Sequence, residues 1–186
     1  MAQRVVFLDR DGVLNRAFPE GGTTRPPASL AELELLPGVR ESLARLRDAG
    51  FVLVVVTNQP DVARGTQTRA AVEAINAHMR AELPLLDVFA CYHDSADKCA
   101  CRKPKPGMLT LAAAKHDLDL DSAFLIGDRW SDIVAAHAAG CRAVLIDTPF
   151  SHAERCAPDA VVGDILGATD WILETVAAKT ASRSAA

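Results

Sequence analysis

Short apolar runs alternate with segments of helical periodicity along the whole chain. Most of the runs are rich in branched aliphatic residues and stop at glycine or polar residues, which is the pattern of buried parallel strands. They predict strands at Val5–Leu8, Phe51–Val56, Asp87–Tyr92, Ala123–Ile126 and Ala143–Ile146, and a short edge strand at Ala160–Val162.

Between these runs, apolar residues recur at intervals of three and four, the period of an amphipathic helix. The helix predicted between Pro37 and Gly50 has proline at its start and glycine at its end, the usual asymmetry of helix termini. One of the other predicted helices has Val72, Ile75, Met79 and Leu83 on one face. The remaining ones begin at Pro106, cover Ile133–Ala139, and contain Trp171 and Leu173. The segment Phe18–Ser29, rich in Gly, Pro and Thr, predicts a loop.

This alternation predicts an α/β fold with three layers, a Rossmann-like parallel sheet between two layers of helices. A length of 186 residues indicates one domain over residues 1–178, and the small polar residues of 179–186 indicate a frayed tail. The carboxyl ends of parallel strands share one edge of a sheet. The polar loops after Leu8, Val56, Tyr92 and Ile126 should therefore meet there.

Composition narrows the class of protein. The chain is 49% hydrophobic and 24% charged, with a net charge of −4 and no long basic block, so we expect no nucleic-acid partner. Its first apolar run is too short for a signal peptide, and no stretch is long enough to span a bilayer. We therefore expect a cytoplasmic protein without a membrane partner, whose five cysteines are free or bound to metal.

Carboxylates follow two of the predicted strands. Asp9 and Asp11 come directly after the first strand, and Asp128 follows Gly127 in the same way. Three such carboxylates supply hard oxygen ligands, which predicts a magnesium site of Asp9, Asp11 and Asp128. Taken alone, the first pair could also be a polar strand end. Asp132 either faces back towards this site or is a helix-start carboxylate favoured by the helix dipole.

Two further segments offer groups that bind anions. Thr57 and Asn58 end the second strand, where a hydroxyl and backbone N–H groups can bind phosphate oxygens, although strand-end turns use the same residues. Arg102 and Lys103 lie in a proline-rich, extended stretch. Cations near a carboxylate cluster attract an anion, whereas a solvated surface is the simpler alternative.

Cysteine and histidine gather in one short stretch. Cys91, His93, Cys99 and Cys101 offer three thiols and an imidazole, the ligand set of a tetrahedral structural zinc site. A loop of reduced thiols is the alternative. We favour zinc because the stretch lacks apolar residues that would hold it in place.

In their order along the chain, these pieces resemble the motifs of the haloacid dehalogenase superfamily of phosphohydrolases. Asp9-Arg-Asp-Gly is similar to the first motif, Thr57 to the second, Lys103 to the third, and Gly127-Asp128 through Asp132 to the fourth. The resemblance implies that Asp9 is a nucleophile and Asp11 a general acid and base. It also implies that Mg²⁺, Lys103 and Thr57 stabilise charge on the phosphoryl group, with Asp132 in support.

The cysteines followed by Arg-Lys-Pro resemble a branch of this superfamily that has zinc and no separate cap domain, and that acts on heptose bisphosphates or histidinol phosphate. The heptose type implies a monomeric enzyme that removes the 7-phosphate of a small sugar bisphosphate through an aspartyl-phosphate. Two departures, Pro60-Asp61-Val62 and Arg129 after Asp128, leave histidinol-phosphate hydrolysis open. A silent zinc-stabilised binding module is the alternative from another class. The expected substrate-binding residues are Asn58, Arg64, Arg102 and Arg129.

Overall fold

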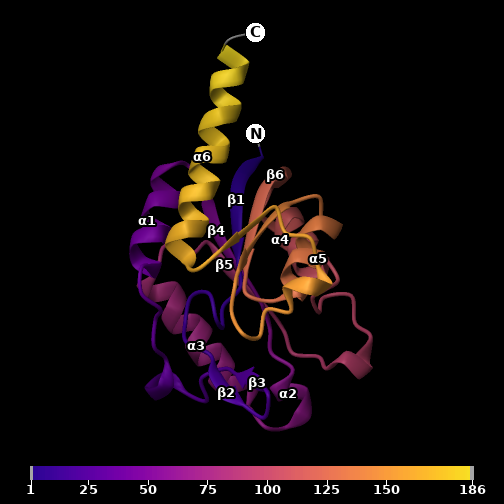
Figure 1. Ribbon diagram of the computed structural model, residues 1–186. Helices are drawn as coiled ribbons and strands as arrows, with labels where there is room; N and C mark the ends of the chain where they lie inside the picture. The colour runs from indigo at the N-terminus through magenta and orange to yellow at the C-terminus, as the bar shows by residue number, and fades with distance from the viewer. Residues whose placement is uncertain (1, 185–186) are drawn as a thin grey trace.

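A parallel sheet of six strands, in the order β5-β4-β1-β6-β7-β8, forms the centre of the protein (Figure 1). The structure is a computed structural model that describes residues 2–184. The strands of this sheet are β1 (Gln3–Leu8), β4 (Val52–Asn58), β5 (Asp87–Cys91), β6 (Leu118–Gly127), β7 (Arg142–Ile146) and β8 (Ala160–Val162).

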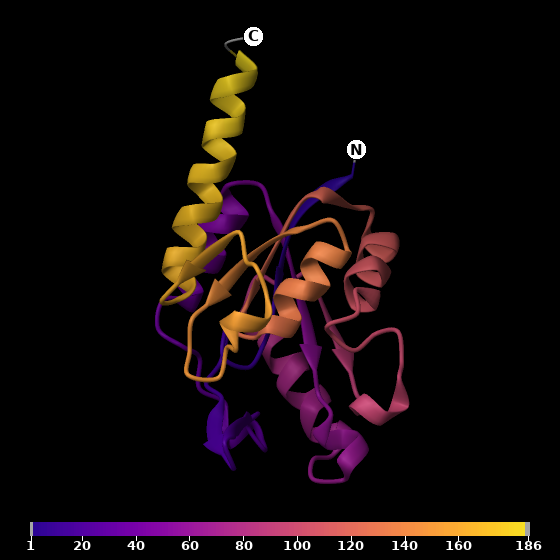
Figure 2. The same ribbon diagram turned by 45° about the vertical axis from the view of Figure 1, so that its right-hand side comes forward.

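Helices cover both faces of the sheet, which confirms the three-layer prediction (Figure 2). One face carries α1 (Val39–Asp48), α3 (Arg69–Glu82) and α6 (Ile165–Ser184), and the other carries α4 (Gly107–His116) and α5 (Trp130–Ala138). A single-turn helix, α2 (Asp61–Arg64), follows β4, and 3₁₀ turns occur at Leu30–Glu32, Ser95–Asp97 and Ala153–Arg155. None of the helices described in residues 2–184 is long and apolar enough to cross a membrane.

The central strands are apolar throughout because both of their faces are buried. In β1, Val6 and Leu8 pack beneath α1 and α6, whereas Val5 and Phe7 point to the side of α4 and α5. Alternation of side chains in a strand sends neighbours to opposite faces. A continuous apolar run is therefore what a strand covered on both sides requires.

The structure differs from the sequence prediction in a few places. The loop predicted at Phe18–Ser29 contains a hairpin of two short strands, β2 (Phe18–Glu20) and β3 (Thr23–Arg25), joined by a Gly-Gly turn. Strand β6 begins at Leu118, well before Ala123, since its first residues pair with the start of β1. The backbone of α6 is helical to Ser184, where fraying was expected from residue 179. The last two residues of that predicted tail lie outside the described part of the chain.

A buried carboxylate links the start of β5 to the end of α4. Asp87, at the start of β5, accepts hydrogen bonds from Nζ of Lys115 and Nε2 of His116, both at 2.8 Å, at the end of α4. Burial acts to raise the pKa of Asp87, but these bonds and one from the backbone N–H of Val88 outweigh it and lower the pKa to about 2. The ionised carboxylate therefore stabilises the folded protein.

We expect Asp87→Asn to lower the free energy of unfolding at pH 7 by about 2 kcal/mol, the value of a pKa depressed from 3.8 to about 2. A depressed carboxyl pKa stabilises above the unfolded pKa, and that contribution disappears as the pH falls through the folded pKa. The deficit of the variant in urea unfolding should thus shrink by roughly half at pH 3. Asp48→Asn, at an exposed position of α1, is the control and should leave the free energy of unfolding at pH 7 nearly unchanged. A deficit for Asp87→Asn that is constant with pH would contradict the assignment.

Candidate active site

A cavity of about 540 Å³ opens at the carboxyl ends of the strands, where the sequence predicted that polar loops would meet. The ends of β1, β4 and β6 form its floor, with Asp9, Thr57 and Asp128 among the lining residues. The hairpin β2–β3, α2 and the segment between β5 and α4 form its walls. Residues 91–102, from the last residue of β5 to Arg102, are called the cysteine loop below.

Three carboxylates meet on the floor of the cavity. Asp9, Asp128 and Asp132, here called the carboxylate cluster, have ligand oxygens that all lie within 4.8 Å of one another. All three are buried, and Oδ1 of Asp128 has no hydrogen-bond partner among the described residues. Burial, with the charges of Asp9 and Asp132, raises the pKa of Asp128 well above its usual range. Hard oxygen donors packed this closely, one of them unpartnered, fit a magnesium ion.

Gly12 allows this packing. Its φ of 93° lies in the left-handed region, and a Cβ at this position would overlap the carboxylate of Asp128. Only glycine accepts both the conformation and the close approach. The turn after β1 therefore brings the chain directly against the end of β6.

Lys103 is buried and pairs with the cluster. Its Nζ lies 2.9 Å from Oδ1 of Asp9 and 2.5 Å from Oδ1 of Asp132, and it donates to the carbonyl oxygen of Val56 at 2.7 Å. Burial acts to lower the pKa of Lys103, but the charges of Asp132 and Asp9 outweigh it and raise that pKa. Burial raises the pKa of Asp9 to about 6, although the positive charge of Lys103 acts to lower that pKa. Lys103 is thus a fixed cation at the centre of the site.

Asp11 lies outside the carboxylate cluster, and its role as a magnesium ligand stays a prediction. Its oxygens accept hydrogen bonds from Nδ2 of Asn15 at 2.9 Å, from Nε2 of Gln59 at 2.7 Å, and from the guanidinium of Arg10 at 3.0–3.2 Å. These donors turn the carboxylate away from the cluster. Asp132 takes the place expected for Asp11, and its Oδ2 also accepts from the backbone N–H of Arg129.

The two polar residues at the end of β4 differ in their surroundings. Oγ1 of Thr57 accepts from Nε2 of Gln59 at 2.9 Å, so its own hydrogen is free to be donated into the cavity. The side-chain amide of Asn58 is occupied, since it donates to the carbonyl oxygen of Lys103 and accepts from the Lys103 backbone N–H. Asn58 thus fixes the backbone that carries Lys103, and its contact with substrate stays a prediction.

Two of the three predicted substrate-binding arginines are held by protein groups. Arg64 makes a bidentate pair with Asp94, at 2.8 and 2.9 Å, and so joins α2 to the cysteine loop. Arg129 donates to Oγ1 of Thr24 at 2.5 Å and to the carbonyl oxygen of Phe150 at 3.2 Å, and so holds the hairpin β2–β3. Each of these guanidinium groups fixes a wall of the cavity. Both arginines also line the cavity, and their contact with substrate stays a prediction.

Two cations of the cysteine loop remain available. Arg102 lines the cavity, and within residues 2–184 its guanidinium makes one hydrogen bond, of 3.3 Å, to the carbonyl oxygen of His93. Lys98 also lines the cavity, and no bond of its Nζ is seen within residues 2–184. Sequence reasoning missed Lys98. Its left-handed backbone, with a φ of 48°, has no signature in the residue type.

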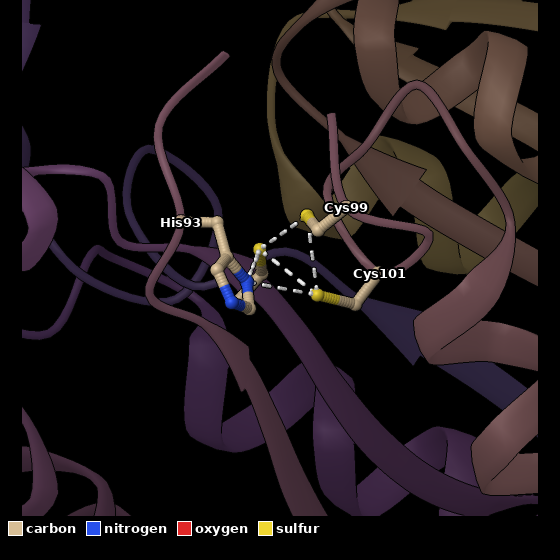
Figure 3. A group of neighbouring side chains, drawn as sticks. His93, Cys99 and Cys101 are labelled. Atoms are coloured by element: carbon tan, nitrogen blue, oxygen red, sulfur yellow. Dashed lines mark hydrogen bonds between the residues drawn. The ribbon is translucent and has the colours of Figure 1, made fainter. Parts of the chain in front are cut away.

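The four predicted zinc ligands come together. Figure 3 shows the side chains of His93, Cys99 and Cys101 pointing towards one another, and the sulfur of Cys91 completes the group. The sulfur–sulfur distances are 3.2–3.7 Å, and Nδ1 of His93 lies 3.3 and 3.5 Å from two of the sulfurs. A tetrahedron with Zn–S bonds of about 2.3 Å places its sulfurs about 3.8 Å apart, so the donor set fits zinc.

Comparison with known proteins finds a matching family and similar phosphatases. Residues 100–169 match the family model Hydrolase_like, whose description is "HAD-hyrolase-like". The chain is 35% identical to a D-glycero-D-manno-heptose-1,7-bisphosphate 7-phosphatase of Thermosynechococcus vestitus, over 92% of this chain and 96% of the relative. It is 37% identical to a D-glycero-beta-D-manno-heptose-1,7-bisphosphate 7-phosphatase of Pseudomonas aeruginosa, over 80% and 83% of the two chains.

A solved structure extends the likeness to three dimensions. The D,D-heptose 1,7-bisphosphate phosphatase of B. bronchiseptica, crystallised with magnesium and phosphate, superposes with a TM-score of 0.78 at 32% sequence identity. The alignment covers 93% of this chain and 99% of the other.

Proposed function

Because the chain belongs to the haloacid dehalogenase-like hydrolases and is a phosphoric monoester hydrolase, we propose that it removes the 7-phosphate of D-glycero-D-manno-heptose 1,7-bisphosphate. The observation that carries this proposal is the distribution of cations in one cavity. Buried Lys103 lies at the carboxylate cluster, and Arg102 and Lys98 are available on the cysteine loop. A substrate with two phosphates fits such a site, one phosphate at each group of cations.

The chemistry we propose uses two aspartates in turn. An oxygen of Asp9 attacks phosphorus, the bond from phosphorus to the ester oxygen breaks, and Asp11 gives a proton to the leaving alkoxide. Asp11 then takes a proton from the water that attacks the aspartyl-phosphate, which releases inorganic phosphate and restores Asp9. Nζ of Lys103 and the free hydroxyl hydrogen of Thr57 stabilise charge on the phosphoryl oxygens.

Two metal ions complete the proposal. Asp9, Asp128 and Asp132 would hold Mg²⁺, which when bound supplies positive charge to the transferring phosphoryl group. Magnesium in the related crystal structure supports this assignment. Cys91, His93, Cys99 and Cys101 would hold a structural Zn²⁺, and the fit of their spacing to a tetrahedron supports it.

A phosphate-release assay over a panel of substrates tests the proposed function. The panel contains both anomers of heptose 1,7-bisphosphate, histidinol phosphate and p-nitrophenyl phosphate. We expect the bisphosphates to give the highest kcat/KM, and phosphorus NMR to show that the 1-phosphate remains on the sugar. A preference for histidinol phosphate would replace the proposed substrate while retaining the chemistry.

Arg102→Ala and Lys98→Ala should separate recognition from chemistry. Each removes a charge-assisted contact worth roughly 1.5–3 kcal/mol, so kcat/KM for the bisphosphate should fall on the order of tenfold to a hundredfold. Hydrolysis of p-nitrophenyl phosphate, which has no second phosphate, should barely change. Arg47→Ala, an exposed arginine of α1, is the matched control. Equal losses on both substrates would reject the second-phosphate role.

A further inference from the structure

Arg10 is the largest fully buried side chain of the described residues, and the proposed chemistry gives it no role. It lies between the two aspartates of the first motif and is almost completely shielded from solvent. A buried guanidinium is costly unless it is paired and hydrogen-bonded. Its position at the floor of the site, rather than on the surface, therefore needs an explanation from its partners.

Both partners of Arg10 are polar and fixed. Its Nε and Nη2 donate to the two oxygens of Asp11, at 3.2 and 3.0 Å, and its Nη1 donates to Oδ1 of Asn76 at 2.8 Å. Asn76 is buried on α3, a helix of 14 residues packed against the sheet. The planar fork of an arginine binds a carboxylate in a single orientation. Arg10 thus holds Asp11 at a fixed position relative to α3.

The two buried cations of the site, Lys103 and Arg10, pair with different carboxylates. Lys103 pairs with Asp9 and Asp132, whereas Arg10 pairs with Asp11. On its other side, Asp11 accepts from Gln59, whose amide also bonds Thr57. Without Arg10, the carboxylate of Asp11 would keep its bonds from Asn15 and Gln59 but lose the guanidinium contact that reaches both of its oxygens.

We propose that Arg10 is a positioning residue that holds Asp11 for proton transfer, with Asn76 as its anchor. The inference rests on the proposed function only in that Asp11 exchanges the proton with the leaving group and with water. The proton moves from Asp11 to the ester oxygen as the bond to phosphorus breaks. Arg10 touches neither phosphorus nor the leaving group in this arrangement. Its effect should therefore depend on how strongly the leaving group needs a proton.

The test follows the first half-reaction, which is release of the leaving group in a single turnover with enzyme in excess. It compares an alkyl phosphate that the wild-type protein hydrolyses with p-nitrophenyl phosphate, whose leaving phenolate needs no protonation. Hydrolysis of the aspartyl-phosphate, in which Asp11 takes a proton from water, is common to both substrates and does not enter this rate. General acid catalysis contributes about a hundredfold to ten-thousandfold. We expect Arg10→Lys to lower the single-turnover rate on the alkyl phosphate on the order of a hundredfold, and that on p-nitrophenyl phosphate less than about threefold. Asp11→Asn should give the same selective loss, and Arg10→Lys should add little to it.

Two further variants separate positioning from stability. Asn76→Ala leaves the Arg10 pair with Asp11 intact but removes its anchor, so it should give a smaller loss of the same selectivity. Ile75→Val, the adjacent core residue of α3, should lower the melting temperature without changing the ratio of the two substrates. Equal losses on both substrates for Arg10→Lys, or none, would overturn the proposal. Wild-type activity on another alkyl phosphate but not on the heptose bisphosphate would overturn only the proposed substrate.

Discussion

Asp9→Asn should abolish turnover, with kcat lower by about four orders of magnitude or more, because an amide keeps the shape of the side chain but is not a nucleophile. The fold should survive, since Lys103 keeps its contact of 2.5 Å with Asp132. The measurement is phosphate release by the variant, together with its circular dichroism. Asp121→Asn, an exposed aspartate in the middle of β6, is the matched control.

The same experiment tests the intermediate. Wild-type protein quenched in acid during turnover should carry a phosphoryl group on the peptide that contains Asp9, and the variant should carry none. Substantial turnover by a folded Asp9→Asn protein would reject the aspartyl-phosphate mechanism. Phosphorylation of a different residue would reject the assignment to Asp9 while keeping a covalent route.

Loss of zinc should have the second large effect. We expect about one zinc per chain in carefully prepared protein, and almost none in Cys101→Ser, because a tetrahedral structural site needs all four of its ligands. The cysteine loop would then lose what orders it, so the melting temperature should fall by about 10 °C and kcat/KM on the bisphosphate should fall with it. Metal analysis, thermal unfolding and the activity assay report these three effects.

Cys156→Ser provides the control for this prediction. Its sulfur donates to the carbonyl oxygen of Ala153, away from the cysteine loop, so the variant should keep both its zinc and its activity. A native protein free of zinc, or a Cys101→Ser protein with unchanged zinc content, would leave these residues as a group of reduced thiols.

The strands were predictable because a strand that is buried on both faces appears in the sequence as an uninterrupted run of apolar residues. The approximate place of the site followed, since the carboxyl ends of those strands meet at one edge. Which carboxylates come together at the site was harder to predict. That Asp132 rather than Asp11 joins Asp9 and Asp128 depends on donors from distant segments, such as Gln59, which follows β4 and donates to Asp11. Chain order does not reveal such contacts.

Of the residues that the sequence analysis did not predict to be part of the site, some had a weak signal in the sequence and others had none. Gln59 lies two residues after Thr57, so period-two alternation already placed it on the same side. The burial of Arg10 is set by Asn76, 66 positions away along the chain, and nothing in the local sequence marks it. The hairpin at Phe18–Arg25 was read as a loop because two strands of three residues are too short to show a period.

Figure 1 shows that the two ends of the described chain lie on the same side of the molecule, where β1 begins. The cavity lies on the opposite side, at the carboxyl ends of the strands. Strand β1 runs from the side of the chain ends towards Asp9, and α6 carries the chain outwards again beyond the body of the protein. A fluorescent label or an affinity tag joined at either end would therefore stand well clear of an incoming sugar. For immobilised assays, this geometry favours attachment through the last turn of α6, which leaves the mouth of the cavity facing the solution.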